Sequence, residues 1–246
     1  MGPVREARVF VDALTRNIAA TQASGPVLVD VSADGYGHGT VRVAAAARAA
    51  GARSLFAATV DDALRTAALV PGADVVVGRV APGRIDEIRA AGISPLSERP
   101  DERVGRDALY GFDGVSAPAL SLRSRVLSTK AIREGDGVSY GYTYRAPRDG
   151  RTALVGVGYG DGVHRHAGNT VSVLIDGERL PVVGRVAMNV FVVFLDDRAV
   201  ADGAPVVLFG DPDAGEPSVV DWAAALQVDP AAVTAGIAPR VERIGA

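Results

Sequence analysis

The stretch VLVDVSADGYGHG, residues 27–39, sets the organisation of the first half of this chain. Residues 27–31 form a short apolar run, the pattern of a buried strand. A glycine-rich turn follows, and the alanine-rich segment 41–50 then has the spacing of a helix with one apolar face. This order predicts a strand, a loop and a helix, which together make one βα unit.

The same alternation continues after this unit. Short apolar runs at 54–58 and 74–77 predict two more strands, and segments 60–70 and 84–91 have helical periodicity. Strands separated by helices favour a parallel sheet whose ligand-binding loops lie at the carboxyl ends of the strands. Residues 32–39 occupy such an end, so we expect a functional site there.

The second half of the chain has a different character. From Leu120 onward it contains short apolar segments typical of β-strands, at 153–157, 171–175, 190–195 and 206–209. Asp-Gly pairs, a strong turn signal, begin at Asp136, Asp161, Asp176 and Asp202. We therefore predict two domains: an α/β domain at residues 1–115, and an all-β domain of antiparallel strands or a barrel at residues 116–246.

Composition limits the classes of function. The chain has 246 residues, of which 48% are hydrophobic, so it can bury a sizeable core as a soluble globular protein. With a net charge of -3 and no basic block, we expect neither nucleic acid nor a membrane as a partner, whereas small polar or anionic ligands would fit. Cysteine is absent, which excludes disulfides and thiolate chemistry. Because the N-terminus is not signal-like and no long apolar run occurs, we expect a cytoplasmic protein.

The loop at residues 32–39 resembles the active-site signature of the alanine racemase family, which uses pyridoxal phosphate (PLP). That family has Lys-Ala-Asn/Asp-Ala-Tyr-Gly-His-Gly after a strand, and its lysine holds PLP as a Schiff base. Here Ser32 stands at the lysine position, and a hydroxyl cannot form that bond. The resemblance implies that Tyr36 would hydrogen-bond the cofactor phosphate. We expect no covalently held cofactor, although PLP is the cofactor that the resemblance implies.

Five runs in the second half resemble the family's C-terminal β-domain and occur in the family's order. They are PALSLRSRV (118–126), VSYGYTY (138–144), GYGDG (158–162), PVVGRVAMN (181–189) and GIAPRV (236–241). The resemblance implies that Tyr140 is a catalytic acid/base reaching the cofactor of the other subunit, and hence that the protein is a homodimer. It also implies that Tyr159 and Met188 line the substrate end. Without these motifs, the tyrosines would be interpreted as packed strand residues and Met188 as core filling.

The family's barrel is only partly present. A complete (β/α)8 barrel, or TIM barrel, has about 250 residues, far more than precede the β-rich half here. VFVDALTRN (9–17) and FAATVDDA (56–63) resemble its opening, and RVGRDALYG (103–111) resembles its closing Arg-x-Gly-Ile-x-Leu-Tyr-Gly, whose arginine faces the pyridine nitrogen. Because the spacing is one residue longer, either Arg103, two residues before Gly105, or Arg106 would hold that place. The family's substrate-carboxylate and phosphate loops are missing between these runs, so we expect an incomplete (β/α) barrel-like domain with edges that are paired or covered.

The chain offers little to replace the missing lysine. Lys130 is the only lysine, and it lies where a strand runs into a turn, an ordinary place for a solvated side chain. His164 and His166 make an incomplete set of metal ligands, so we expect no metal site.

Three hypotheses for function follow. The first is a catalytically degenerate alanine racemase homologue, a pseudoenzyme kept as a dimer or as a small-ligand-binding protein; it explains Ser32, the single lysine and the missing loops together. The second is an active PLP-dependent racemase or isomerase that holds its cofactor without a covalent bond, or through Lys130 of a neighbouring subunit. The third is a new activity in the same cleft that uses Tyr140, Ser32 and His38.

Overall fold

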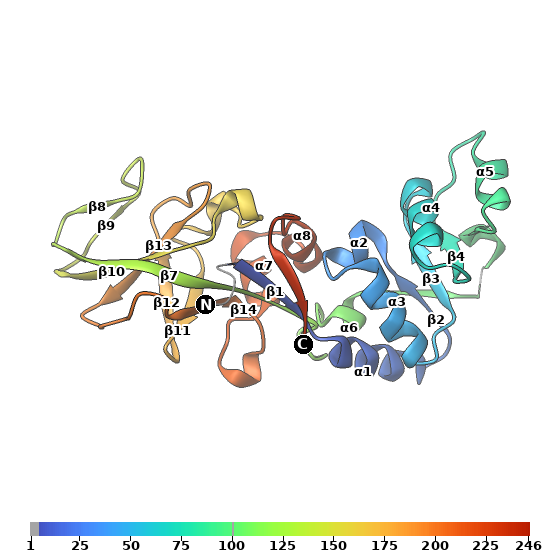
Figure 1. The fold of residues 1–246 in the computed structure, drawn as a ribbon, viewed down its shortest axis with the longest axis horizontal. Coiled ribbons are helices and arrows are strands. Elements are labelled where there is room, and N and C mark those ends of the chain that lie inside the picture. The colour runs from blue at the N-terminus through green and yellow to red at the C-terminus, as the bar shows by residue number, and fades with distance from the viewer. Residues whose placement is uncertain (1–4, 100) are drawn as a thin grey trace. The chain divides into compact units, whose positions relative to one another are not determined.

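The computed structural model describes residues 5–99 and 101–246, which form two compact units (Figure 1). Residues 10–119 make an α/β unit, and residues 5–9 together with 120–246 make a β unit. The predicted fold class, an incomplete parallel α/β barrel followed by an antiparallel β domain, is confirmed. The division differs from the predicted boundary near residue 115, because β1 (Arg5–Val9) pairs with β7 (Leu120–Ile132) and β15 (Glu242–Gly245) of the β unit.

The α/β unit contains a five-stranded parallel sheet in the order β5-β4-β3-β2-β6. Its edge strands have only two and three residues, and short edges of this kind resist unwanted pairing. Its elements are α1 (Val11–Gln22), β2 (Val27–Asp30), α2 (Ser32–Tyr36), α3 (Thr40–Ala49), β3 (Ser54–Ala57), α4 (Val60–Leu69), β4 (Asp74–Val77), α5 (Ile85–Ala90), β5 (Ser94–Pro95), a 3-10 turn (Leu96–Glu98), β6 (Arg103–Gly105) and α6 (Asp107–Tyr110).

The two faces of this sheet are buried in different ways. Alternate residues of β3 and β4 pack against α4 and α5 in one apolar cluster, formed by Ala57, Val60, Ala63, Val75, Val77, Ile88 and Ile93. On the opposite face Leu28, Phe56 and Val76 are covered by Leu96 and Val104. Asp30 lies two residues after Leu28 on β2, so its side chain points to this second face, the one that would line a closed barrel.

The β unit is an antiparallel barrel. Because β10 pairs with both β13 and β7, the strands β10-β13-β12-β11-β14-β7 form a closed ring. The 13 residues of β7 allow this, since its first half pairs with β14 and its second half with β10. The remaining elements are β8 (Gly137–Val138), β9 (Tyr144–Arg145), β10 (Gly150–Val155), β11 (Ser172–Ile175), β12 (Glu178–Val183), β13 (Phe191–Asp196), β14 (Pro205–Phe209), α7 (Val219–Leu226), α8 (Pro230–Ala235) and three 3-10 turns (Tyr159–Asp161, Arg165–Ala167, Pro212–Ala214).

Two of the predicted Asp-Gly turns differ in the structure that they form. Asp176 and Gly177 join β11 to β12 with φ values of 49° and 83°, the left-handed pair that a tight hairpin needs. Asp161 and Gly162 also lie between two strands, β10 and β11, as predicted, but they are part of a longer connection in which Asp161 ends a 3-10 turn and is fully buried. Within the described part of the chain, no helix has the length and apolar character needed to cross a membrane.

Candidate active site

Ser32 begins a left-handed turn at the carboxyl end of β2. Ala33, Asp34, Gly35 and Tyr36 have φ values between 50° and 59°, a region that costs an L-residue roughly 1–2 kcal/mol. Hydrogen bonds fix the turn: Asp34 Oδ1 accepts from the Thr40 N–H at 2.8 Å and from the Thr40 hydroxyl at 3.0 Å. Backbone strain of this kind persists only where the surroundings hold it in place.

Asp30 is the centre of the polar network at this turn, and it is a residue that the sequence analysis did not single out. Its side chain is buried, with Oδ1 accepting from the Ser32 hydroxyl at 2.6 Å and the Ser32 N–H at 3.0 Å. Its Oδ2 accepts from the Tyr36 hydroxyl at 2.6 Å. Short hydrogen bonds to a carboxylate are about twice as strong as neutral ones. Ser32 Oγ in turn accepts from the Ala58 N–H at 2.9 Å, so the hydroxyl both donates and accepts within the chain.

Aromatic rings enclose this network. Tyr110 is buried and donates its hydroxyl to the Asp30 carbonyl at 2.6 Å, with its ring 5.4 Å from those of Tyr36 and Phe112. His38 is also buried, 4.7 Å from the Tyr110 ring, and its Nδ1–H donates to the Gly35 carbonyl at 2.9 Å. His38 thus satisfies the backbone of the turn. Burial, together with the hydrogen bond to Asp30, raises the pKa of Tyr36 well above its usual value, and burial does the same to the pKa of Tyr110.

The raised pKa values of Tyr36 and Tyr110 predict a loss of stability at alkaline pH. A tyrosine whose pKa is higher in the folded than in the unfolded state stabilises the fold. This contribution is fully present below the unfolded-state pKa of 10.0, and it is lost as the pH rises toward the folded-state pKa. Above about pH 10, the free energy of unfolding should fall by about 1.4 kcal/mol per pH unit for each such tyrosine. Urea unfolding followed by circular dichroism from about pH 8 to about pH 11 measures this slope. Because the chain has only one lysine, Lys130, we assign a fall in stability at this pH to the tyrosines. A free energy of unfolding that does not change with pH, or a slope that Tyr36→Phe does not reduce, would contradict this prediction.

Of the two arginines considered for the pyridine-facing position, Arg106 lies at the turn. Its guanidinium is 5.9 Å from the centre of the Tyr36 ring and forms an ion pair with Asp107 at 2.6 Å. Arg103 is exposed on β6 and donates to the Thr21 carbonyl at 3.3 Å. Gly105 lies between them where the chain is tightly packed, because a Cβ there would be 2.5 Å from Cγ2 of Val27.

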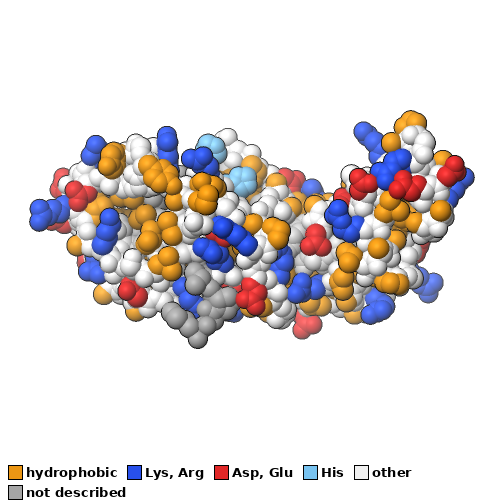
Figure 2. Space-filling view, turned by 45° about the horizontal axis from the view of Figure 1, so that its top comes forward, with side chains coloured by type: hydrophobic (Ala, Val, Ile, Leu, Met, Phe, Trp, Pro, Cys, Tyr) orange, Lys and Arg blue, Asp and Glu red, His pale blue; other side chains and the backbone are white. Residues whose placement is uncertain are grey.

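Tyr140, Tyr159 and Met188 all belong to the β unit and are exposed by 52%, 37% and 51%. The Tyr159 N–H donates to the Ala187 carbonyl at 2.9 Å, and the next N–H donates to the Met188 carbonyl at 2.8 Å, so these two segments run side by side. The loop that carries Tyr140 is tied to the second segment by the Ser139 hydroxyl, which donates to the Arg185 carbonyl at 2.7 Å. Apolar side chains (orange) gather over the β unit in Figure 2.

Asp161 fixes the segment that carries Tyr159. Its Oδ2 accepts from the Gly158 N–H at 2.8 Å, and its Oδ1 lies 2.7 Å from Nε of Arg240 and 3.1 Å from Nε of Arg5. The carboxylate is fully buried, and a buried charge is tolerated only when it is paired in this way. Asp161 therefore links three separate parts of the β unit.

Removal of this carboxylate should destabilise the β unit. Asp161→Ala leaves two arginines and one buried N–H without their acceptor, a loss of about 3 kcal/mol in the free energy of unfolding. Urea unfolding followed by the fluorescence of Trp222, the only tryptophan, measures it. Asp161→Asn retains an acceptor, so its loss should be smaller, about 1–2 kcal/mol. Equal losses in the two variants would show that the charge has no role.

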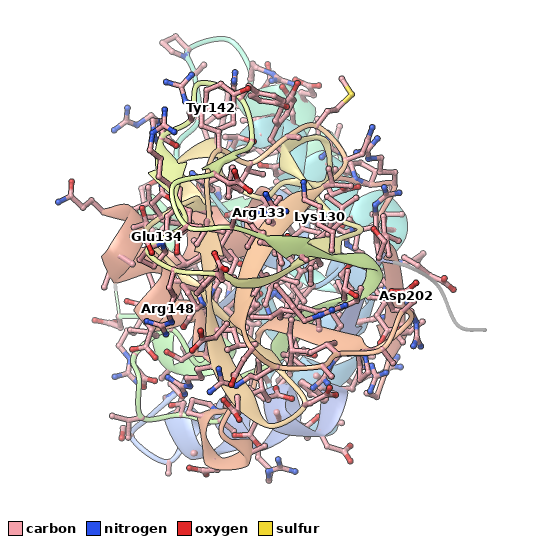
Figure 3. All side chains as sticks on the ribbon, turned by 90° about the vertical axis from the view of Figure 1, so that its left-hand side faces the viewer. Lys130, Arg133, Glu134, Tyr142, Arg148 and Asp202 are labelled. Atoms are coloured by element: carbon pink, nitrogen blue, oxygen red, sulfur yellow. The ribbon has the colours of Figure 1, made fainter. Side chains whose placement is uncertain are left out.

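Lys130, the only lysine, lies in the β unit, whereas Ser32 lies in the α/β unit. It is an exposed residue of β7 and pairs with Thr152 of β10. Figure 3 shows it on the β7 ribbon, with Arg133 beyond it along the chain.

The two units define a two-domain protein, an open parallel barrel joined to an antiparallel β-domain. The family model described as alanine racemase, C-terminal domain, matches residues 119–245, and the model described as alanine racemase, N-terminal domain, matches residues 9–102. The chain belongs to the alanine racemase family.

Individual relatives agree with this assignment. The alanine racemase of Thermobifida fusca is 38% identical over 165 residues, which cover 63% of this chain and 44% of that protein. That of Mycobacterium tuberculosis H37Rv is 45% identical over 125 residues, covering 47% of this chain and 33% of that protein. The matched region thus spans less than half the length of these curated relatives.

Solved structures share the fold. The alanine racemase from Streptomyces coelicolor A3(2) aligns with a TM-score of 0.86 at 24% identity, over 98% of this chain and 97% of that one. The alanine racemase from Bartonella henselae with covalently bound pyridoxal phosphate aligns with a TM-score of 0.89 at 18% identity, over 100% of both chains.

The residues around Ser32 do not fit covalently held PLP. Ser32 offers no amine, and both hydrogen-bonding roles of its hydroxyl are taken by Asp30 and Ala58. Tyr36 has one O–H to donate, and it is donated to Asp30. The Asp30 carboxylate also places negative charge where a phosphate would need donors. The network is complete without a ligand.

Proposed function

We propose that this chain is a catalytically degenerate alanine racemase homologue, a pseudoenzyme retained as a dimeric or small-ligand-binding protein. The observation that carries the proposal is the pairing of Ser32 with Asp30 at 2.6 Å, where the family resemblance implies a cofactor-holding lysine. Racemisation requires a proton to be removed from one face of the substrate and returned to the other. With no amine at position 32, only Tyr140 of the implied pair of acid/base groups is present.

The remaining site residues take reduced roles in this proposal. Tyr36 acts as a donor to Asp30 in place of a phosphate ligand. Of the two arginines considered for the pyridine-facing position, we assign it to Arg106, which lies over the Tyr36 ring, and not to Arg103. Tyr140, Tyr159 and Met188 stay available at the surface of the β unit to a small ligand or to a second copy of the chain. We propose a cytoplasmic homodimer.

An absorption spectrum tests the proposal directly. The purified protein is incubated with PLP, dialysed exhaustively and treated with borohydride, and any modified peptide is located by mass spectrometry. We expect no retained, reducible chromophore and no alanine racemisation. A chromophore trapped on Lys130 would favour the alternative, an active PLP-dependent enzyme, and Lys130→Ala is then the control that should abolish it.

The homodimer is tested by the mass of the native protein in solution. Exposed apolar side chains at Tyr140, Tyr142 and Met188, which are 52%, 64% and 51% exposed, support a covered surface there. Light scattering should give twice the chain mass, and Tyr142→Glu should shift the protein toward monomer. A monomer at every concentration would rule out the dimer while leaving the proposal about catalysis intact.

A further inference from the structure

A groove of about 450 Å³ lies between α3 and the end of α4 in the α/β unit (Figure 1). Apart from two arginines, Arg48 and Arg53, its described lining residues are apolar or glycine, and none of them carries a carboxylate. The residues around Ser32 do not line it, so it is separate from the site described above.

Small side chains on α3 leave the space for this groove. Val41, Ala44, Ala45 and Arg48 recur at intervals of three or four residues, so they lie along one stripe of the helix. Leu55 of β3, which is buried, also lines the groove. A larger side chain anywhere along this stripe would occupy the space that the alanines leave.

Two apolar side chains remain in contact with water at this groove. Val41 and Leu69 are 55% and 47% exposed, and Val115 is the only other large apolar side chain that is exposed among the described residues of the α/β unit. Covering apolar surface is favourable, and a concave apolar surface that the chain itself does not cover is typical of a ligand-binding groove.

Arg48 and Arg53 place positive charge where α3 ends and β3 begins. Both are exposed, and no carboxylate of the described residues forms an ion pair with either of them. Asp74, at the start of β4, is already occupied, because it accepts from Arg99 at 2.8 Å and from the Ser54 hydroxyl at 2.6 Å. In a chain with a net charge of -3, these arginines are a local positive charge beside an apolar surface.

Beyond Arg53 the lining becomes polar. A second cavity, of about 400 Å³, adjoins the groove at Arg53 and is also lined by Gln22, Ser54 and Glu102. The Glu102 carboxylate accepts from Arg99 at 2.9 Å, so its charge is paired. The groove therefore has a polar, positively charged end and an apolar end.

We propose that this groove binds an amphiphilic carboxylate, a small molecule with an apolar chain and one anionic end. The carboxylate would accept from the guanidinium groups of Arg48 and Arg53, whose planar forks match its paired oxygens. The apolar chain would lie along α3 toward Val41, two helical turns or about 10 Å from Arg48. The volume of the groove lies within the range of small-molecule sites.

This proposal goes beyond the function proposed above. It uses no residue of the Ser32 turn and none of the β unit, so it holds whether or not PLP binds. The charge of the two arginines favours an anionic ligand over a second copy of this acidic chain's apolar surface, which would leave both of them unpaired.

Isothermal titration of the full chain with octanoate, at constant ionic strength and below its micelle concentration, tests the site. We expect saturable binding at a single site. Hexanoate and butanoate keep the carboxylate, and the affinity should fall about two- to fourfold for each methylene group removed. 1-Octanol keeps the chain but has no charge, so it should bind about tenfold more weakly than octanoate.

A substitution that fills the groove tests where the apolar chain lies. Ala45→Phe should abolish saturable binding, because its ring occupies the space beside Val41 and Arg48. Ala49→Phe is the matched control, since it makes the same substitution at an exposed alanine of the same helix outside the groove, and it should bind octanoate as the native protein does. Circular dichroism checks that both variants are folded.

Removal of the arginines tests where the carboxylate lies. Arg48→Ala and Arg53→Ala should each weaken octanoate binding about two- to tenfold and leave the binding of 1-octanol unchanged. Arg16→Ala is the matched control for net charge, because Arg16 is an exposed arginine of α1 in the same unit and does not line the groove. It should leave both affinities unchanged.

Absence of saturable octanoate binding would overturn the proposal, and so would equal affinities for octanoate and 1-octanol. An equal loss in Ala49→Phe or in Arg16→Ala would also overturn it, because the effect would then come from the helix or from the net charge. If Ala45→Phe left octanoate binding intact but lowered the native mass in light scattering, the groove would instead be a contact surface for a second copy. None of these outcomes bears on the proposed function, which the PLP spectrum tests separately.

Discussion

Asp30→Asn/Ser32→Lys should form a borohydride-reducible adduct with PLP about 10 to 1000 times faster than Ser32→Lys alone. The reason is the position of Asp30 Oδ1, 2.6 Å from Ser32 Oγ. An ammonium placed there would pair with the carboxylate, and a neighbouring carboxylate raises a lysine pKa by about 1–3 units. Only the neutral amine is a nucleophile, so its concentration falls by the same factor.

The adduct is measured by absorption after dialysis and by mass spectrometry after reduction. Asp30→Asn without a lysine at position 32 is the control, since it removes the charge and supplies no amine. Equal trapping by the single and double variants would show that Asp30 is not the barrier. Absence of trapping in both would place the barrier in the missing barrel loops and contradict the prediction.

Asp30 also shows what the sequence does not reveal. The run at 27–31 predicts a buried strand, and β2 lies there. The apolar pattern does not, however, show which groups would pair with a carboxylate inside such a strand. Its partners depend on the left-handed turn at Ala33–Tyr36, which brings the Tyr36 hydroxyl back to the strand. Of those four residues Gly35 favours such a conformation and Asp34 tolerates it, but Ala33 and Tyr36 do not, so a run of four could not be derived from local preferences.

The elements themselves were largely predictable, because their apolar periodicity is clear. The strands at 54–57 and 74–77 and the helices at 40–49 and 60–69 agree with the predicted ranges to within one residue. β1 was missed as part of the β unit, since REARV has three charged residues in five and no apolar alternation. Its place is set by pairing with β7 and β15, which are far away in the sequence.

The partners of Asp161 were hidden for the same reason. An Asp-Gly pair predicts a turn from local geometry, but Asp161 is held by Arg5 and Arg240, at opposite ends of the chain. Arg165 and Arg185 likewise line one groove of the β unit, where the segments of Gly168 and Gly184 are in close contact. Long-range packing of this kind leaves no signal in a single sequence.

Tyr110→Ala should cost the α/β unit about 4–5 kcal/mol of its free energy of unfolding, the largest stability effect of any single substitution proposed here. The ring is 1% exposed and packs against those of Tyr36, His38 and Phe112, so its removal leaves a cavity the size of a phenol. The Asp30 carbonyl also loses its donor at 2.6 Å, directly beneath the strained turn. Circular dichroism during urea unfolding measures the loss, because the α/β unit holds most of the long helices.

Tyr110→Phe separates the two contributions to this loss. It keeps the ring and removes only the hydroxyl that donates to Asp30, so its cost should be about 1–2 kcal/mol. The fluorescence of Trp222, which lies on α7 of the β unit, follows that unit separately in the same samples. If Tyr110→Ala cost no more than Tyr110→Phe, the aromatic packing would contribute nothing to holding the turn. The left-handed conformation would then depend on Asp30 and Asp34 alone, and Asp30→Asn should unfold it.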